Sequence, residues 1–426
     1  MRIGFITVSS TLPGQLEVGR RLMLQASSLL SEFERDLEIS DLVTNPANAE
    51  TIAKDLKGKI SGAIVVVATG GTERSVEVIA ANLGVPVLIL ANPFNNSLAS
   101  SLEVYAVLRE RGLAVKLLYS PLDPNIVPAI KSFVRICRTI YRLRESRLGQ
   151  IGESSPWILT SKGSDLIKEK IGPGVVRLEV AELLALAARA DPSDAEKLAG
   201  ELKSKFGGMV EPSMEDLINA ARVYLAMREI ASRHGLSAIT VRCFDLVDHG
   251  LTGCIGMSLC NDLGIVAGCE ADLDAVLTMM IISFLTDEPC WMANVVRVNE
   301  GTNTVTLAHC TIATKMLADV KRSALRSHFE SGKCVSIQGP LKGADVTIAR
   351  LGGRKLEKMT IATGKIIGCD LRDPGLCRTQ AEVKLDGMVE DLIANTLGNH
   401  QVLAYGKLKP ILLDFCRFKG IEPIVI

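Results

Sequence analysis

A chain of 426 residues exceeds what a single hydrophobic core usually accommodates, so two or three domains are expected. Its 48 Lys and Arg residues balance its 48 Asp and Glu residues, which argues against a nucleic-acid or anionic-membrane partner. No uninterrupted apolar run is long enough to span a bilayer, and the first residues lack the apolar region of a signal peptide. The sequence therefore predicts a cytoplasmic protein.

The 11 cysteines are an odd number, spread along the chain without a CxxC pair or a zinc-ligand spacing. Most lie in apolar runs, where a free thiol behaves as a small hydrophobic side chain. We interpret them as reduced core residues. A few disulfides remain an alternative if the source is a hyperthermophile.

Residues 1–153 alternate short apolar runs, at 3–8, 62–68 and 85–90, with segments of helical periodicity, at 14–31, 72–83 and 97–111. This alternation predicts a doubly wound α/β domain, in which helices flank a parallel sheet. Gly70 and Gly71 form a strand-to-helix turn whose backbone N–H groups can bind a hydroxyl group or an anion, although ordinary tight turns also use glycine.

Residues 149–156, which read GQIGESSP, have the composition of a linker, and a central α/β domain is predicted over 154–333. Helices are expected near 192–205 and 214–234, with Ser213 and Asp216 as a capping pair for the second of them. The segment 311–331 is predicted to be a long helix that closes this domain.

Within the central domain, apolar spacing predicts a helix over 270–285 with Glu270 in its first turn. Segments 291–298 and 304–310 read as two strands of a hairpin. If Val298 pairs with Val305, Asn294 faces His309, but the register is open. Acidic residues in a first helical turn usually favour the helix dipole, and a lone histidine on an apolar strand usually belongs to the core.

Residues 334–426 contain short β-rich runs separated by Gly, Asp and Pro, which predict a small antiparallel β-barrel domain, with a sandwich as the alternative. His400 belongs to this domain. A site that combines His400 with Glu270 and His309 would therefore lie between the central and the C-terminal domains.

Several segments, in this order along the chain, resemble the L-fucose/L-arabinose isomerase family. They are 241–245 (VRCFD), 261–264 (NDLG), 269–272 (CEAD), 277–279 (LTM) and 398–406 (GNHQVLAYG). The segments 69–73 and 96–99 are also similar to parts of fucose isomerase-like proteins. The likeness covers most of the chain, and the ordered set is more specific than any one segment.

The resemblance implies a site for a divalent metal ion. Glu270 matches the family's first metal-binding and acid/base carboxylate, His400 matches its late ligand, and His309 matches a ligand of arabinose isomerases. Asn294 falls at the position of the second acidic ligand. Such a set of oxygen atoms and imidazoles suits Mn²⁺, with Mg²⁺ or Co²⁺ as alternatives.

Asn294 departs from the family pattern. An Asn carbonyl oxygen binds a hard cation, but it does not accept a proton as a carboxylate does. Either a neighbouring acid, Asp287 or Glu288, takes this place, or Asp272 or Asp245 supplies the second acid/base group, or the usual activity is lost. Of these, Asp272 joins Glu270 as the candidate catalytic pair.

The resemblance also implies substrate contacts. Arg242 and Arg378 lie in matching segments, although a structural salt bridge is the simpler role for either. Glu73 and Asn96 would contact the sugar of a neighbouring subunit, since related enzymes form trimers or hexamers.

The implied activity is a metal-dependent aldose–ketose isomerase that acts on a pentose or a 6-deoxyhexose through an ene-diol intermediate. Two alternatives remain open. The first is an altered family member that binds a carbohydrate without turnover, and the second is an isomerase of a sulfonated or phosphorylated sugar.

Overall fold

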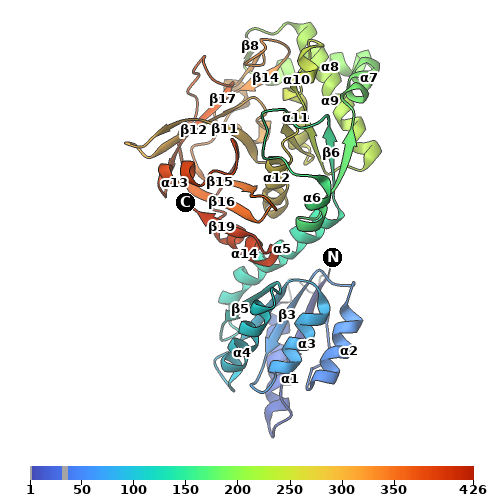
Figure 1. Ribbon diagram of the computed structural model, residues 1–426, viewed down its shortest axis with the longest axis vertical. Coiled ribbons are helices and arrows are strands. Elements are labelled where there is room, and N and C mark those ends of the chain that lie inside the picture. The colour runs from blue at the N-terminus through green and yellow to red at the C-terminus, as the bar shows by residue number, and fades with distance from the viewer. Residues whose placement is uncertain (1, 31–36) are drawn as a thin grey trace. The chain divides into compact units, whose positions relative to one another are not determined.

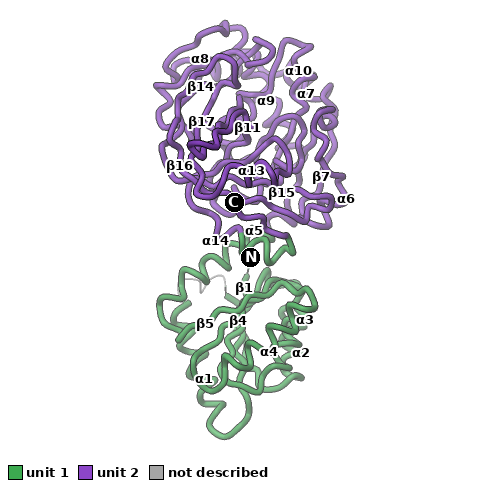
Figure 2. The backbone as a smooth tube through the Cα atoms, turned by 60° about the vertical axis from the view of Figure 1, so that its left-hand side comes forward, with its two compact units in different colours: residues 1–141, 413–421 green, residues 142–412, 422–426 purple. Residues whose placement is uncertain are grey.

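The computed structural model describes residues 2–30 and 37–426, which form two compact units (Figure 2). Unit 1 comprises residues 1–141 and 413–421, and unit 2 comprises residues 142–412 and 422–426. Over the described ranges, no helix is both long and apolar enough to cross a membrane. The division into three domains, ending at residues 153 and 333, stays a prediction.

Unit 1 is built on a parallel sheet (Figure 1). Its strands follow the spatial order β2 (Leu37–Ile39), β1 (Ile3–Val8), β3 (Gly62–Val67), β4 (Val87–Ala91) and β5 (Val115–Tyr119). The helices between them are α1 (Gln15–Leu29), α2 (Pro46–Leu56), α3 (Glu73–Leu83) and α4 (Ser97–Glu110). The predicted parallel α/β arrangement is confirmed. Residue 31, the last of the predicted helix 14–31, lies outside the described residues.

A second parallel sheet lies in unit 2. Its strands follow the order β10 (Val266–Cys269), β9 (Ala238–Val241), β6 (Arg147–Ile151) and β7 (Gly174–Leu178). The predicted linker 149–156 is therefore wrong over its first residues, because 149–151 are buried in β6 between two neighbouring strands. Glycine there permits close packing in a sheet rather than a flexible connection: a Cβ on Gly149 would lie 2.5 Å from Leu236.

Unit 2 also contains helices, which precede or follow the strands of this sheet in the sequence. They are α6 (Ser164–Lys170), α7 (Val180–Arg189), α8 (Pro192–Lys205), α9 (Met214–His234), α10 (Phe244–Val247), α11 (Cys254–Asp262) and α12 (Leu273–Thr286), and α5 (Val127–Glu145) joins the two units in sequence. The predicted capping pair of α9 is confirmed, since Ser213 Oγ accepts a hydrogen bond from the Asp216 N–H (3.1 Å) and Asp216 accepts one from the Ser213 N–H (2.8 Å).

An antiparallel sheet completes unit 2. Its order is β15 (Asp345–Gly352), β18 (His400–Tyr405), β11 (Trp291–Asn299), β12 (Thr304–His309), β17 (Thr379–Leu385) and β16 (Lys358–Gly368), with β19 (Glu422–Val425) parallel to β16. The antiparallel C-terminal strands are confirmed, and β15 also pairs with β16. The barrel form stays a prediction. The pairings of β11 with β18 and β12 place Asn294, His400 and His309 on three adjacent strands.

The predicted helix 311–331 is wrong. This segment contains two 3-10 turns, Thr314–Met316 and Val320–Arg322, followed by β13 (Ala324–Arg326), which pairs with β14 (Ser336–Gln338) and β8 (Gly208–Met209). The Asp262 carboxylate binds the Thr314 hydroxyl (2.6 Å) and the Lys315 N–H (3.0 Å), which holds the chain in the first turn. Tertiary contacts therefore override the local helical pattern.

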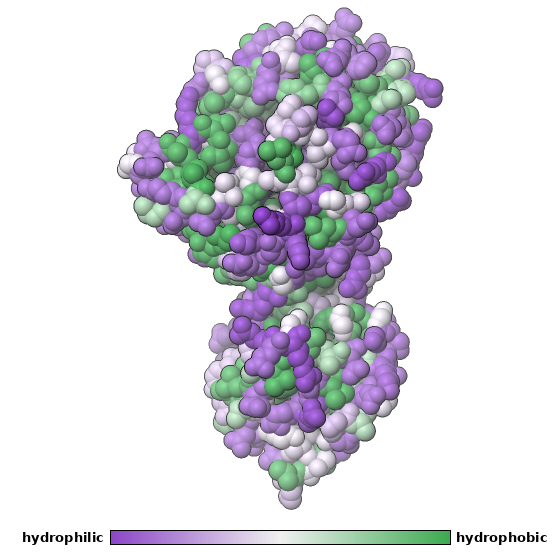
Figure 3. Space-filling model, viewed as in Figure 1, coloured by the Kyte–Doolittle hydropathy of each residue, from purple (hydrophilic) through white to green (hydrophobic). Residues whose placement is uncertain are grey.

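The apolar content of the chain is largely buried. On the face shown in Figure 3, hydrophobic side chains form small patches between hydrophilic ones. All eleven cysteines are unpaired in the described part of the chain, and nine are buried, which confirms the core position of those nine. Their reduced state stays a prediction.

Candidate functional site

Glu270 lies in the turn between β10 and α12, not in the first turn of the helix. Glu270 and Ala271 both have a left-handed backbone conformation, with φ of 60° and 51°. This conformation is incompatible with a right-handed α-helix. Asp272 is the N-cap instead, and its side chain accepts a hydrogen bond from the Ala275 N–H (3.0 Å). The carboxylate of Glu270 is thus carried by a strained turn and not by a helix.

The predicted pairing of Asn294 with His309 is wrong, although Val298 does pair with Val305. The register shifts between Val295 and Arg297, so Asn294 faces Ala308 on one side and His400 on the other. Such a bulge adds one residue to one strand and changes every pairing beyond it.

His400 is held between two carboxylates. Its Nδ1 lies 2.9 Å from Asp272 Oδ2, and its Nε2 lies 3.5 Å from Glu270 Oε2. The ring is 1% exposed, and Nε2 has no hydrogen-bond partner among the described residues. Because Nδ1 is fixed by Asp272, Nε2 is the nitrogen presented to Glu270.

Asp272 is in turn fixed by Arg350, a residue that the sequence did not single out. The Arg350 guanidinium donates to both carboxylate oxygens, at 3.0 and 3.2 Å, and to the His400 carbonyl oxygen at 2.8 Å. Both side chains are completely buried. Burial alone would raise the pKa of Asp272, but Arg350 and His400 outweigh it and hold that pKa well below its usual range.

Glu270 has the opposite electrostatic setting. Burial raises its pKa, while His400 and a hydrogen bond from Trp157 partly oppose the change. Glu270 is therefore the more basic carboxylate of the predicted catalytic pair, and Asp272 remains ionised in an ion pair.

His309 lies beside His400, with ring centroids 5.5 Å apart and the rings nearly perpendicular. Its Nδ1 lies 2.8 Å from the Thr311 hydroxyl oxygen. Burial lowers the pKa of His309 to about 3, and the neighbouring His400 adds to the effect. A neutral imidazole is the form that binds metal ions.

Glu270, Asn294 and His309 line one small cavity of about 30 Å³, roughly the space of one water molecule. Sequence reasoning missed most of its other residues, which are Cys243, Phe244, Cys254, Cys269, Cys310, His328, Glu330 and Cys377. The scarcity of histidine could have drawn attention to His328, which instead lay within a wrongly predicted helix. Asn294 also accepts a hydrogen bond from the Asn399 amide (3.0 Å).

The predicted substrate-binding arginines have structural partners. Arg242 pairs with Asp245 at 3.0 Å, so Asp245 also has a charged partner. Arg378 donates to the carbonyl oxygen (2.8 Å) and the hydroxyl (3.0 Å) of Ser327.

Glu73 and Asn96 belong to unit 1. They line a hollow of about 580 Å³ at the carboxyl ends of β1, β3 and β4. In a parallel sheet of the order 2-1-3-4-5, this is where ligands commonly bind.

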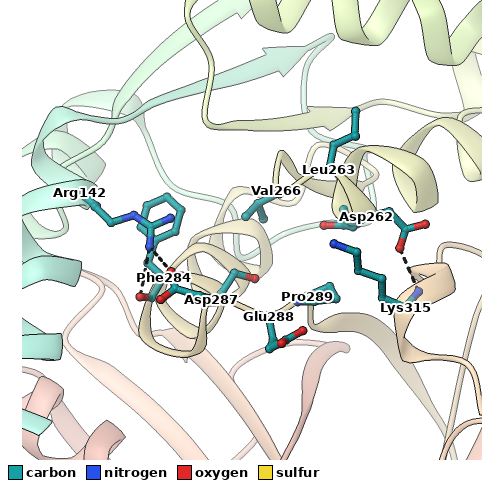
Figure 4. Close-up of a pocket in the computed structure, with 12 residues that line it drawn as sticks. Arg142, Asp262, Leu263, Val266, Phe284, Asp287, Glu288, Pro289 and Lys315 are labelled. Carbon is teal, nitrogen blue, oxygen red and sulfur yellow. Dashed lines mark hydrogen bonds and ion pairs between the residues drawn. The ribbon is translucent and has the colours of Figure 1, made fainter. Parts of the chain in front are cut away.

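Asp287 and Glu288, the alternatives to Asn294, line a different cavity of about 240 Å³ (Figure 4). Asp287 ends α12, which at about 1.5 Å per residue places it roughly 20 Å from the end capped by Asp272. It pairs with Arg142 (2.7 Å), whose guanidinium lies 4.0 Å from the centre of the Phe284 ring. Neither acid is brought to the cavity of Glu270.

Two potential metal-ligand atoms lie close together at this site. Within residues 2–30 and 37–426, no three His, Cys, Asp or Glu side chains are grouped to hold a metal. The pair that does approach is Glu270 Oε2 and the unpaired His400 Nε2, and the amide oxygen of Asn294 is an additional hard donor at the same cavity.

Gly398→Ala is expected to destabilise unit 2 by about 1–3 kcal/mol. Gly398 has a φ of 154°, and an added Cβ would lie 2.6 Å from the Arg350 guanidinium, so the substitution would displace Arg350 from Asp272. Urea unfolding followed by tryptophan fluorescence measures this, since both tryptophans, Trp157 and Trp291, belong to unit 2. In the control Gly174→Ala, a Cβ meets nothing within 4 Å; an equal loss there would contradict the explanation.

Asp274→Asn is expected to stabilise the protein in a pH-dependent manner. Burial raises the pKa of Asp274 to about 7, against opposition from Lys162 at 3.5 Å, while the unfolded carboxyl titrates near 4. The wild type should therefore lose stability relative to the variant as the pH rises from about 4 to 7, and no further above it. Urea unfolding at pH 4, 5.5, 7 and 8 measures the difference, and a constant difference would count against this pKa.

Comparisons with known proteins agree with the isomerase class that the motifs predicted. No protein-family model matches the chain. Sulfoquinovose isomerase from Alkalicoccus urumqiensis is 22% identical over 353 residues, 79% of each chain. The enzymes of that name from Clostridium sp. (strain MSTE9) and Priestia aryabhattai are 22% and 20% identical, over 71% and 68% of this chain and 70% and 66% of theirs. Among solved structures, the apo-structure of D-lactate dehydrogenase from Escherichia coli covers 67% of this chain and 95% of its own, but its TM-score of 0.17 and 15% identity carry no argument.

Proposed function

We propose that this protein is an aldose–ketose isomerase of a modified sugar. The observation that carries the proposal is the buried approach of Glu270 Oε2 to His400 Nε2 at 3.5 Å beside a cavity. The curated relatives named sulfoquinovose isomerase support the reaction class, and they favour a sulfonated sugar over the pentose or 6-deoxyhexose expected from the motifs.

The protein's residues would divide the proton chemistry as follows. Isomerisation moves one proton from C2 to C1 of the sugar and another from O2 to O1, and the C2 proton is only weakly acidic. The raised pKa of Glu270 makes it a better proton acceptor, so it takes the C2 proton on Oε2 and returns it to C1. Asp272 stays ionised beside Arg350 and positions the His400 ring through Nδ1.

We further propose that the site holds a divalent cation, with Mn²⁺ as the first to test. His400 Nε2 is an unpaired buried donor, and a carboxylate oxygen 3.5 Å away is at a separation common for two ligands of one ion. Asn294 and His309 line the same cavity and would complete the set. Such an ion polarises the sugar carbonyl when bound.

The remaining predicted roles form part of the same proposal. Arg242 and Arg378 would contact the substrate from unit 2. Glu73 and Asn96 would contact it from a neighbouring subunit of a trimer or hexamer.

Wild-type protein supplied with Mn²⁺ is expected to convert sulfoquinovose to its ketose, measured by NMR together with deuterium uptake at C1 of the ketose in D₂O. Glu270→Gln removes the proton acceptor and should lower kcat by about 100-fold or more. Glu288→Gln, which alters a carboxylate of a separate cavity, is the matched control and should leave kcat unchanged. Equal activity of Glu270→Gln, or no turnover across sulfonated, phosphorylated and plain aldoses, would overturn the proposal.

Asn294→Asp is expected to tighten Mn²⁺ binding by about tenfold or more, because a carboxylate neutralises part of the charge that an amide leaves uncompensated. Isothermal titration calorimetry with Mn²⁺ alone measures this without any sugar. Asn399→Asp adds the same charge to the exposed partner of Asn294 and should have a smaller effect. Identical affinities for the wild type and Asn294→Asp would exclude Asn294 from the site.

A second candidate function is carbohydrate binding without turnover, which Asn294 favours because an amide replaces the family's second carboxylate. Calorimetric binding of the sugar without product would support it. Turnover that Glu270→Gln abolishes would eliminate it.

A further inference from the structure

A cluster of thiols lines the cavity beside Glu270, and the proposed isomerisation does not use them. Five of the eleven cysteines are found there, namely Cys243, Cys254, Cys269, Cys310 and Cys377. They come from distant parts of the sequence and share no spacing motif. The fold therefore concentrates thiol chemistry at one place in unit 2.

Two of these thiols have their sulfur atoms very close together. Cys243 Sγ lies 2.8 Å from Cys269 Sγ, although the residues are 26 positions apart in sequence. A disulfide has an S–S distance of about 2.05 Å, so bond formation needs an approach of less than about 1 Å.

The parallel sheet explains this proximity. β9 and β10 are neighbours, with Val241 paired to Cys269 at their carboxyl ends. Cys243 follows two residues after the end of β9, so the turn after β9 reaches back to the last residue of β10. The two backbones are thus fixed by sheet hydrogen bonds before any sulfur chemistry takes place.

We propose that Cys243 and Cys269 are a reversible oxidation site, which a hydroperoxide converts to an intramolecular disulfide. Cys243 attacks one peroxide oxygen, forms a sulfenic acid and releases water in the case of hydrogen peroxide. The Cys269 thiol then attacks the sulfenic sulfur, loses its proton and expels a second water. Two thiols and one peroxide thus give one disulfide and two waters.

The geometry of the pair favours the second step. The 2.8 Å separation of the two sulfurs places the Cys269 thiol next to a sulfenic acid formed on Cys243. A dithiol such as dithiothreitol reverses the reaction by two thiol–disulfide exchanges and leaves as its own cyclic disulfide.

The bond would act directly on the candidate site, because Cys269 immediately precedes Glu270. The Glu270 carbonyl oxygen already accepts a hydrogen bond from the Ser155 N–H (3.0 Å), and its backbone is left-handed. A disulfide would hold this turn from its other end as well. Oxidation is therefore expected to rigidify the segment that carries the Glu270 carboxylate.

Mass spectrometry of the full-length protein tests the proposal without sugar, metal or turnover, so the result stands whether or not isomerase activity is found. After treatment of the folded protein with hydrogen peroxide, the intact mass should fall by 2 Da. Unfolding and alkylation should then label nine thiols instead of eleven, and an unreduced digest should contain a peptide linking Cys243 to Cys269. Dithiothreitol should restore all eleven.

Cys243→Ser and Cys269→Ser should each abolish the linked peptide, while Cys260→Ser, a buried thiol of α11 outside the cavity, should retain it. Hydrogen–deuterium exchange of residues 266–272 should slow on oxidation of the wild type and stay unchanged in Cys243→Ser. Retention of all thiols, conversion to sulfinic acid, or a link to Cys254, Cys310 or Cys377 instead would overturn the proposal. Since the wild type alone decides the primary result, a variant that fails to fold does not affect it.

Discussion

The candidate site depends on the buried ion pair between Arg350 and Asp272. Neither side chain is exposed to water. The opposite charge and the surrounding polar groups therefore compensate each ion for the hydration that it has lost. Removing one partner of such a pair typically costs about 3–5 kcal/mol, because the other charge is left alone in the interior. Through Asp272 the pair fixes His400, and through His400 it fixes the environment of Glu270.

This arrangement gives three nearby carboxylates different properties. Glu270, Asp272 and Asp274 fall within one short stretch of the sequence, yet burial raises the pKa of the first and the last, while Arg350 lowers that of the second. Residue type therefore says little about protonation here. The positions of Arg350 and His400, on strands far along the chain, make the difference.

Much of the fold could be predicted from periodicity, whereas the site could be predicted only in part. The ordered motifs predicted that Glu270 and His400 lie in one site. However, a carboxylate beside a helix gives no sign that a distant Arg350 faces it. The bulge in β11, which pairs Asn294 with Ala308 instead of His309, leaves no local sequence pattern. The segment 311–331 has helical spacing, yet Asp262 and the strands β14 and β8 determine its conformation.

The distances along the chain within the Asp272 network have a consequence for how the protein is made. Asp272 lies 78 positions before Arg350 and 128 before His400. Contacts of such long range require the closure of large loops, so they form late. A nascent polypeptide that ends before β18 leaves Asp272 without its imidazole. The candidate site therefore cannot form until β18 has been synthesised, long after Asp272 itself.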